Sequence, residues 1–499
     1  MHHNFLAMNF LTSLLFTLLL AKAQASSCPF DAAGSGTKAP EISSAVVSAM
    51  KSLITYKTGN VYSIPSKKPS LVGVVSQRFQ IHTIQNPKGF LAKRIQPFIS
   101  LLEGAPSAFS LPKKRRRFGE NFCVAGMVVL GNFEEVSRAL TSPQARTYRL
   151  GSAVLDSKRL TGDRRNTWLL SLSQKGAGGD GMHEQLRAAA DRYIFFRGMV
   201  RQREPKAEQI MNQLVEDYRS MPHGKGGKFF TNKKRGMRPF MIKYIHYCMY
   251  GIDPDDKEKI DILFNFYYGN KAGSAALYYF KVVGRVLGLV ETFQYNRLVK
   301  KVSKIYEESP NLSSFPENEA KYGNLSRKEL ADATIPIMAI AATVGPKHLL
   351  EAAMGCSPLP NRVDGVKTNT TDVFGIWDGL DLDDSGEVER YINEIGRLWL
   401  PVSHTHRVAT EPFTVKMLFK DRTFPTGTEI MIPLSLSMFD ENIWDDAFEF
   451  NHNRHDLVKL NMMFQSVGNK DAGRMCPGKG FAMIMMSEII VRCGKVRRE

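Results

Sequence analysis

Paired and clustered cysteines are missing from this sequence, although it contains six cysteines among 499 residues. The cysteines stand singly and far apart, at positions 28, 123, 248, 356, 476 and 493, and no two of them form a CxxC pair. This spacing argues against a zinc module and against a disulfide scaffold. Because 43% of the residues are apolar, the chain can instead bury a large core.

A hydrophobic stretch long enough for a comfortable membrane span is also lacking. The most apolar run extends from Phe10 to Ala21, and small residues follow it at Ala23 and Ala25. A spanning helix needs about 20 apolar residues, so residues 1–25 are interpreted as a signal peptide, with an uncleaved membrane anchor as the alternative. Both alternatives direct the chain to the secretory pathway, to the endoplasmic reticulum membrane or lumen or to secretion, and they differ in the side that its body faces.

Three glycosylation sequons distinguish these alternatives. They begin at Asn311, Asn324 and Asn369. Asparagine is glycosylated only on the lumenal side, so a glycan would exclude an anchored body that faces the cytosol.

Acidic residues are scarce relative to basic ones, 49 against 67, which gives a formal net charge of +18. Such an excess is compatible with nucleic-acid binding, with an anionic membrane face, or with a basic surface alone. We favour the basic surface, place the membrane face second, and expect no nucleic-acid partner. The basic run from Lys113 to Arg117 follows a secretory leader, so we interpret it as a solvated loop that can rest on anionic lipid. Residues 26–70 are expected to form a linker and a first helix.

The stretch from Phe464 to Phe481, FQSVGNKDAGRMCPGKGF, places Cys476 in a glycine-punctuated loop before an apolar segment. Pro477 suits the first position of a helix, where its missing N–H costs nothing. A thiolate at such a helix entrance is stabilised by unpaired backbone N–H groups, and Arg474 adds a nearby cation. These residues leave two alternatives open, a metal-ligating thiolate and a buried free cysteine.

Two pairs of charged residues have helical spacing. His183 and Arg187 lie four residues apart in a helical pattern from Asp180 to about Phe196, so they share one face. Two adjacent cations suit a pair of carboxylates, and an exposed amphipathic helix is the alternative. Glu394 and Arg397 are three residues apart and can pair directly, although such a pair alone is not specific.

Two helix starts can also be identified. Ser326 and Glu329 form a capping box that begins an apolar helix through His348, kinked at its two prolines. Asp384 is interpreted as a helix cap, since the calcium-like loop around it has Ile392 where a glutamate is needed. The order of segments further predicts two paired strands near residues 406–411 and 424–433.

The pattern around Cys476 resembles the haem-binding loop of the cytochrome P450 superfamily. This loop is longer than the common form, because Asn469 and Ala472 stand where phenylalanine and glycine are usual and Phe464 lies further upstream. Similar lengthening occurs in the allene oxide synthase and hydroperoxide lyase branch and in the fatty-acid peroxygenases. The resemblance implies a mainly α fold with a small β region, the cytochrome P450 fold, formed by residues 71–499.

The resemblance also implies a cofactor and its ligands. The cofactor would be haem b, iron protoporphyrin, and Cys476 would be the axial ligand of its iron. Four cationic side chains would bind the two haem propionates: His183, Arg187, Arg407 and Arg474. A further resemblance, of the segment from Phe450 to Arg454, implies a buried triad of Glu394, Arg397 and Arg454 that supports the haem loop.

In the superfamily, the central helix carries an acid followed by a threonine that relay protons to bound dioxygen. Thr343 corresponds to this threonine, whereas Ala342 occupies the acid position. The resemblance therefore implies a haem-thiolate monooxygenase that inserts oxygen into a small apolar, lipid-like substrate with a reductase as electron donor. The first alternative is a peroxide-driven enzyme, either a peroxygenase or a fatty-acid hydroperoxide rearranging enzyme. The second is a non-catalytic haem- or lipid-binding protein.

The carboxyl-terminal segment is short for this superfamily. Only 23 residues follow Cys476, enough for one helix from about Gly480 to Arg492. Superfamily members usually continue into a hairpin that lines the substrate pocket. We therefore expect either an incomplete chain or a pocket that is open on that side.

Overall fold

The computed structural model describes most of the chain from residue 71 onward, in fifteen segments. These are residues 71–96, 121–124, 126–141, 145–147, 181–222, 227–268, 289–338, 343, 345–355, 373–400, 402, 404–417, 420–447, 449–465 and 475–499. The apolar leader, the linker and first helix expected before residue 70, and the basic run from Lys113 to Arg117 all lie outside the described residues.

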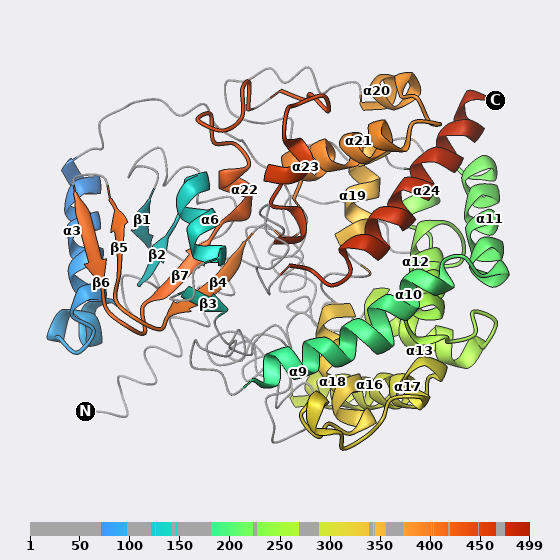
Figure 1. Cartoon of the computed structure of the whole chain (residues 1–499), viewed down its shortest axis with the longest axis horizontal. Coiled ribbons are helices and arrows are strands. Elements are labelled where there is room, and N and C mark those ends of the chain that lie inside the picture. Colours follow the sequence, from blue (N-terminus) through green and yellow to red (C-terminus); the bar gives the residue numbers. More distant parts are fainter. Residues whose placement is uncertain are drawn as a thin grey trace.

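A small β region lies at one side of the molecule and a larger helical region at the other (Figure 1). The main sheet has the strand order β1-β2-β7-β4-β3, and a separate hairpin pairs β5 with β6. The strands are β1 (Phe122–Val124), β2 (Met127–Val129), β3 (Ala145–Thr147), β4 (Thr405–Ala409), β5 (Phe413–Lys416), β6 (Asp421–Phe424) and β7 (Glu429–Ile432). The strand pair expected in this part of the sequence is confirmed, because β4 and β7 pair antiparallel with Arg407 opposite Ile430.

The first described helix, α3 (Leu71–Gln85), is fastened to the sheet. The side chain of Gln77 accepts a hydrogen bond from the Cys123 N–H and donates one to the Cys123 carbonyl, both at 2.8 Å. Gln77 thereby satisfies both backbone groups of the middle residue of the edge strand β1, as a further strand would. The remaining elements beside the sheet are η1 (Leu91–Ile95), α6 (Phe133–Thr141) and α22 (Leu434–Ser437).

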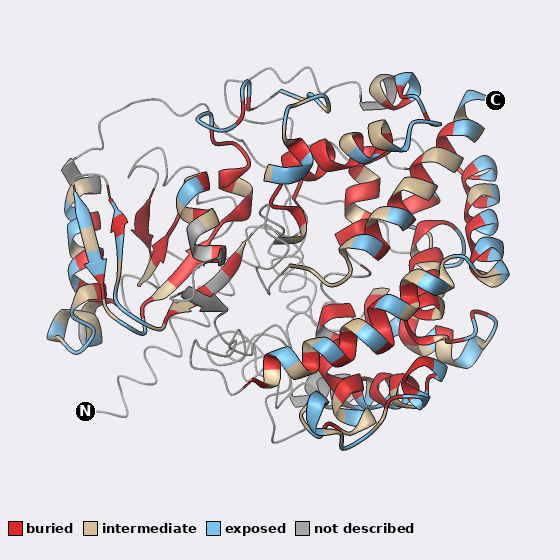
Figure 2. Ribbon diagram, viewed as in Figure 1, coloured by how far each residue is buried: buried red, intermediate tan, exposed pale blue. Residues whose placement is uncertain are grey.

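The helical region contains most of the remaining elements. In chain order they are α9 (Met182–Ala190), η3 (Asp191–Phe195), α10 (Phe196–Arg201), α11 (Pro205–Ser220), η4 (Lys228–Phe230), α12 (Met237–Tyr250), α13 (Lys257–Tyr268), α16 (Leu289–Glu307), α17 (Pro310–Ser313), η5 (Ala320–Tyr322), α18 (Arg327–Ile337), α19 (Gly345–Ala353), α20 (Val373–Gly379), α21 (Ser385–Leu398), α23 (Leu457–Leu460), η8 (Met463–Gln465) and α24 (Lys479–Arg498). Helix α24 packs against α11, α19 and α21. The helices turn their buried faces toward one another, so the core lies between them (Figure 2).

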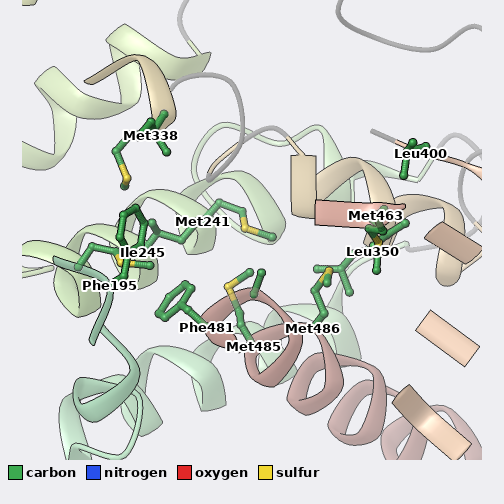
Figure 3. Close-up of a cluster of buried hydrophobic side chains, with 14 of the residues drawn as sticks. Phe195, Met241, Ile245, Met338, Leu350, Leu400, Met463, Phe481, Met485 and Met486 are labelled. Atoms are coloured by element: carbon green, nitrogen blue, oxygen red, sulfur yellow. The ribbon is translucent and has the colours of Figure 1, made fainter. Parts of the chain in front are cut away.

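An apolar cluster occupies the middle of this helical region (Figure 3). Its labelled side chains come from η3, α12, α19, η8, α24 and the segments that follow α18 and α21. They are Phe195, Met241, Ile245, Met338, Leu350, Leu400, Met463, Phe481, Met485 and Met486, and all are buried. Half of them are methionines, whose unbranched thioether side chains fill irregular spaces between helices.

The capping box at the start of the central helix is confirmed. The Glu329 N–H donates to the hydroxyl of Ser326, and the Ser326 N–H donates to the carboxylate of Glu329. In the stretch expected to be one helix through His348 the structure describes two helices. Helix α18 ends at Ile337 and α19 begins at Gly345, and residues 339–342 and 344 between them lie outside the described residues. Pro336 cannot donate within the last turn of α18, whereas Pro346 fits the first turn of α19, where no N–H is needed.

The start of α21 is confirmed and the end of α24 is corrected. Asp384 caps α21 by accepting a hydrogen bond from the Gly386 N–H at 2.8 Å, as expected, and α21 ends at Leu398. Helix α24 extends to Arg498, six residues beyond the expected end at Arg492. Ion pairs with distant parts of the chain stabilise this extension: Lys495 with Asp383 at 2.7 Å and Arg497 with Asp378 at 2.6 Å.

The sequons differ in accessibility. Asn311 is fully buried; its amide donates to the Met249 carbonyl at 2.8 Å and accepts from Arg201 at 3.0 Å. Asn324 is exposed in a turn, and Asn369 lies outside the described residues. A glycan on Asn311 is therefore incompatible with this packing, which corrects its choice as an acceptor in the folded chain. No helix in the described part of the chain combines the length and apolarity of a membrane span.

Candidate functional site

Cys476 lies in the short segment that leads into α24. Its backbone N–H donates to the carbonyl of Phe464 at 2.8 Å, which closes the long loop between these two residues. Phe464 itself has a left-handed backbone, with φ of 65°. Burial raises the pKa of the Cys476 thiol, whereas a hydrogen bond from the Gly478 N–H and the nearby Arg187 cation act to lower it. The Gly478 N–H and the Arg187 charge would stabilise a thiolate ligand.

Arg187 reaches this segment from α9. One terminal nitrogen of its guanidinium donates to the carbonyl of Met475 at 2.8 Å, and its Nε donates to the carboxylate of Asp191 at 2.8 Å. The guanidinium is partly buried, and its side chain is 21% exposed. A guanidinium has five N–H donors, and the contacts of Arg187 with the described residues use two of them, which leaves donors for a further anion such as a carboxylate within that part of the chain.

His183 occupies the preceding turn of the same helix. Its side chain is buried and its Nδ1 lies 3.7 Å from the carboxylate of Glu184. The helical pattern expected from Asp180 to Phe196 is confirmed and continues through η3 and α10 to Arg201. The predicted role of His183, a cationic side chain that binds a haem propionate, stays a prediction.

Arg407 is located on β4, in the other region of the molecule. It is 1% exposed, and one of its guanidinium nitrogens donates to the hydroxyl of Thr405 at 2.8 Å. Its predicted role toward a haem propionate stays a prediction. Arg474 lies outside the described residues, so its predicted role is not tested.

Thr343 lies between the end of α18 and the start of α19. Its side chain is buried, and its hydroxyl and its backbone N–H both point to the carbonyl of Met338, at 3.0 and 3.3 Å. The phenol of Tyr268 donates to the Thr343 carbonyl at 2.7 Å. The hydroxyl proton of Thr343 is therefore used in a hydrogen bond to a backbone carbonyl.

The predicted triad of Glu394, Arg397 and Arg454 is confirmed. Arg397 donates to both carboxylate oxygens of Glu394, at 2.7 and 2.8 Å, and Arg454 donates to one of them at 3.2 Å. The side chains of Glu394 and Arg397 are both 0% exposed and that of Arg454 is 6% exposed. Each charge is thus paired inside the protein, as burial requires.

The two arginines also fix the chain that leads to the cysteine loop. Arg397 donates to the carbonyls of Met438 at 2.8 Å and Ala447 at 2.6 Å. Arg454 donates to the carbonyls of Asp446 and Glu449, both at 2.7 Å, and to that of Asp445. These carbonyls belong to an irregular segment, whose polar backbone groups would otherwise lack partners.

Two contributors to the site were missed from the sequence. Asp191 pairs with Arg187, and the ring of Phe195 approaches the backbone of Gly478 beside Cys476. The four-residue spacing from Arg187 to Asp191 was a usable signal for the first. Nothing local indicates the second, because the two residues are far apart in sequence.

Comparison with known proteins places these features. Residues 387–493 match the family model described as Cytochrome P450. No curated protein matches the chain. The likeness of the lengthened loop to allene oxide synthases and peroxygenases stays a prediction.

Solved structures with a similar fold include CYP109E1 from Bacillus megaterium in complex with corticosterone. It is 14% identical, with a TM-score of 0.52, and the match covers 78% of this chain and 90% of that chain. The P450 heme domain of Tepidiphilus thermophilus is 13% identical, with a TM-score of 0.51, covering 74% and 82%. At these identities the similarity shows the fold, which confirms the expected mainly α architecture with a small β region. Residues 387–493 thus match the cytochrome P450 family model, and the chain shares the fold of solved cytochromes P450.

Proposed function

We propose that this chain is a haem-thiolate oxidoreductase of the monooxygenase type, which inserts an oxygen atom into a small apolar, lipid-like substrate. The observation that carries the proposal is the placement of Cys476 at the entrance of α24, with the Gly478 N–H and the Arg187 cation beside its sulfur. A free buried cysteine would not need these two groups. The confirmed triad, which fixes the chain before the cysteine loop, supports the same conclusion.

Haem b is the cofactor that suits these residues. Cys476 would ligate its iron, and the donors left on Arg187 would bind a propionate together with His183, Arg407 and Arg474. Haem bound to a thiolate supplies the electron density that favours cleavage of an O–O bond. The apolar cluster around Phe195 and Phe481 would exclude water from the neighbourhood of the cofactor, and its methionines would adapt to an apolar substrate.

A peroxide-driven reaction is the second candidate, and Thr343 favours it. The hydroxyl proton of Thr343 is used in a hydrogen bond to the Met338 carbonyl, and the neighbouring acid position is Ala342. Proton delivery for splitting dioxygen therefore lacks its usual carboxylate. A peroxide is already two electrons more reduced than dioxygen and needs no reductase, so a peroxygenase or a hydroperoxide rearranging enzyme fits this part of the chain.

The first experiment is the spectrum of the reduced, carbon-monoxide-bound protein. Thiolate-ligated haem is expected in the wild type and in Cys493→Ser, and its signature should be lost in Cys476→Ser. Cys493 is a matched control because it is a buried free cysteine in the helix that follows Cys476. The same spectrum in Cys476→Ser as in the wild type would refute the proposed ligand.

A second experiment separates the two oxidants. The purified protein is supplied either with a lipid hydroperoxide alone, or with dioxygen, a reductase and NADPH. Turnover with the hydroperoxide alone supports the peroxide-driven candidate, and turnover that requires the reductase supports the monooxygenase. A haem-loaded protein that is silent in both would favour a binding protein over an enzyme.

For the location of the protein we propose the secretory pathway, as the apolar leader suggests. The lumenal and the cytosolic orientation differ in the modification of Asn324, which is the exposed sequon in the described part of the chain. A glycosidase-sensitive mobility shift that disappears in Asn324→Gln would support a lumenal body. An unchanged mobility would support an anchored body that faces the cytosol.

A further inference from the structure

The helical stretch from Met182 to Arg201 carries a carboxylate that the proposed function does not use. Asp191 lies one turn after Arg187, and both of its carboxylate oxygens are 2.8 Å from the Arg187 Nε. The other end of the same guanidinium donates to the Met475 carbonyl, also at 2.8 Å. Arg187 therefore bridges a carboxylate on its own helix and the carbonyl directly before Cys476.

The bridge depends on the direction in which the guanidinium points. An arginine side chain has several rotatable bonds, and holding it in one conformation costs entropy. A carboxylate four residues along the helix fixes the Nε end, which aims the terminal nitrogens away from the helix axis. Because the Asp191 side chain is 44% exposed, this pair contributes little to global stability, and its effect is on orientation.

A second contact joins the same helical stretch to the other side of Cys476. Asp191 begins the π-helical turn η3, and Phe195 ends it. The point where a Cβ on Gly478 would lie is 3.8 Å from both the Phe195 ring and the Cys476 sulfur. The helix thus contacts the residue before Cys476 through Arg187 and the residues around its sulfur through Phe195.

We propose that Asp191 is a positioning residue for the Cys476 segment. Its carboxylate orients Arg187 so that the guanidinium holds the Met475 carbonyl, and its negative charge offsets the Arg187 cation beside the sulfur. Without Asp191, the guanidinium would leave Met475 for solvent or for another anion, and the segment would open more often. Only the consequence for the iron rests on the proposed function, since the bridge itself involves residues of the chain alone.

Hydrogen exchange in the peptide from Met475 to Gly480 tests this bridge. In Asp191→Asn, we expect exchange there to be about two- to fivefold faster, the range of a partly exposed ion pair. Arg187→Ala should have at least the same effect, and the double variant should equal Arg187→Ala because Asp191 acts through Arg187. Glu488→Gln is the matched control: it breaks a four-residue pair with Arg492 at similar exposure, 46%, elsewhere on the surface.

The same variants have a second readout on haem-loaded protein, the reduction potential of the iron. Asp191→Asn removes a negative charge near the ligand sulfur, so the potential should become more positive, and Glu488→Gln should leave it unchanged. Unchanged exchange in Asp191→Asn would overturn the proposal, as would an Asp191→Asn effect that persists in full in the Arg187→Ala background. A chain that binds no haem would refute the proposed function, whereas the exchange measurement would still decide the role of Asp191.

Discussion

On the cysteine side of the candidate site, from Arg187 to the triad, charged groups are paired and directed at the backbone. The Glu394 carboxylate accepts hydrogen bonds from two arginines, and Arg187 donates to the Asp191 carboxylate and to the Met475 carbonyl. On the central-helix side, around α18 and α19, polar side chains instead donate to backbone carbonyls. Thr343 bonds to Met338, and Tyr268 bonds to the Thr343 carbonyl.

This difference separates holding a cofactor from supplying it with protons. The cysteine side has the groups that a thiolate and an anionic cofactor require. The central-helix side has Ala342 in place of the acid before Thr343. A reaction whose oxidant is a peroxide, already two electrons more reduced than dioxygen, would use the first side fully and depend little on the second.

The largest effect is expected when the triad loses its anion. Glu394→Gln leaves the buried Arg397 and Arg454 without a counter-charge, which should cost about 3–5 kcal/mol of unfolding free energy and prevent haem incorporation. Urea unfolding and the haem-to-protein ratio measure the two effects. Glu389→Gln, on an exposed face of the same helix, is the control. Normal haem content in Glu394→Gln would remove the triad from the comparison.

A pH effect is expected from His246, a buried histidine on α12. Its Nδ1 donates to the Ile242 carbonyl at 2.7 Å, so its Nε2 accepts from the Tyr306 phenol at 2.9 Å. Burial lowers the pKa of His246 from 6.5 to about 4. Below the unfolded pKa of 6.5 the unfolded chain takes up a proton that the folded chain refuses until about pH 4. Stability contributed by this histidine is therefore present above pH 6.5 and is lost as the pH falls toward 4.

The expected loss is roughly 3 kcal/mol between these pH values, since each pKa unit corresponds to ~1.4 kcal/mol. Unfolding free energies at pH 7 and pH 4.5 measure it in the wild type and in His246→Leu. The leucine variant is less stable at neutral pH, because it leaves Tyr306 with fewer partners, and its pH dependence should be flatter. His455→Asn changes an exposed histidine, with a side chain that is 94% exposed, and should keep the wild-type slope. An equal slope in His246→Leu would contradict the prediction.

A smaller effect is expected from Tyr268→Phe. This change removes the hydroxyl that donates to the Thr343 carbonyl, a net hydrogen bond worth about 1 kcal/mol. It keeps the aromatic ring, whose centroid lies 5.8 Å from the Arg238 guanidinium. Tyr268→Leu removes both contacts and should cost more. Urea midpoints of the two variants measure the difference. If Tyr268→Phe were as costly as Tyr268→Leu, the hydroxyl alone would account for the stabilisation that Tyr268 provides.

The smallest effect on hydroperoxide turnover is expected from Thr343→Val. If the central-helix side supplies no protons, its loss of one hydroxyl should change this rate by less than about fivefold, in line with a single net hydrogen bond. A loss of about 100-fold or more, the usual contribution of a general acid or base, would contradict the comparison. Rates with hydroperoxide and with dioxygen plus reductase, measured on the same preparation, distinguish the two results.

Features that depend on short spacing were predictable from the sequence. The capping box of Ser326 and Glu329, the pair of Glu394 and Arg397 and the Asp384 cap each join residues within four positions, where helix geometry dictates the contact. The resemblance to cytochromes P450 added Arg454, which lies 60 positions from Glu394.

Features that depend on packing between distant segments were not predictable. Tyr268 and Thr343 are 75 positions apart, and Arg187 and Met475 are 288 apart. The environment of Thr343, between α18 and α19, depends on its contact with Tyr268. The end of α24 likewise depends on acids more than 110 positions away, which helix propensity cannot reveal.

The methionines of the apolar cluster have a consequence for the lifetime of the protein. Met241, Met338, Met463, Met485 and Met486 are buried together in this cluster (Figure 3). Peroxides convert a methionine thioether into a polar sulfoxide, which disrupts packing until a reductase restores it. If peroxide is the oxidant, each molecule carries its own oxidisable groups beside the reaction, and its working life becomes a count of turnovers rather than of hours.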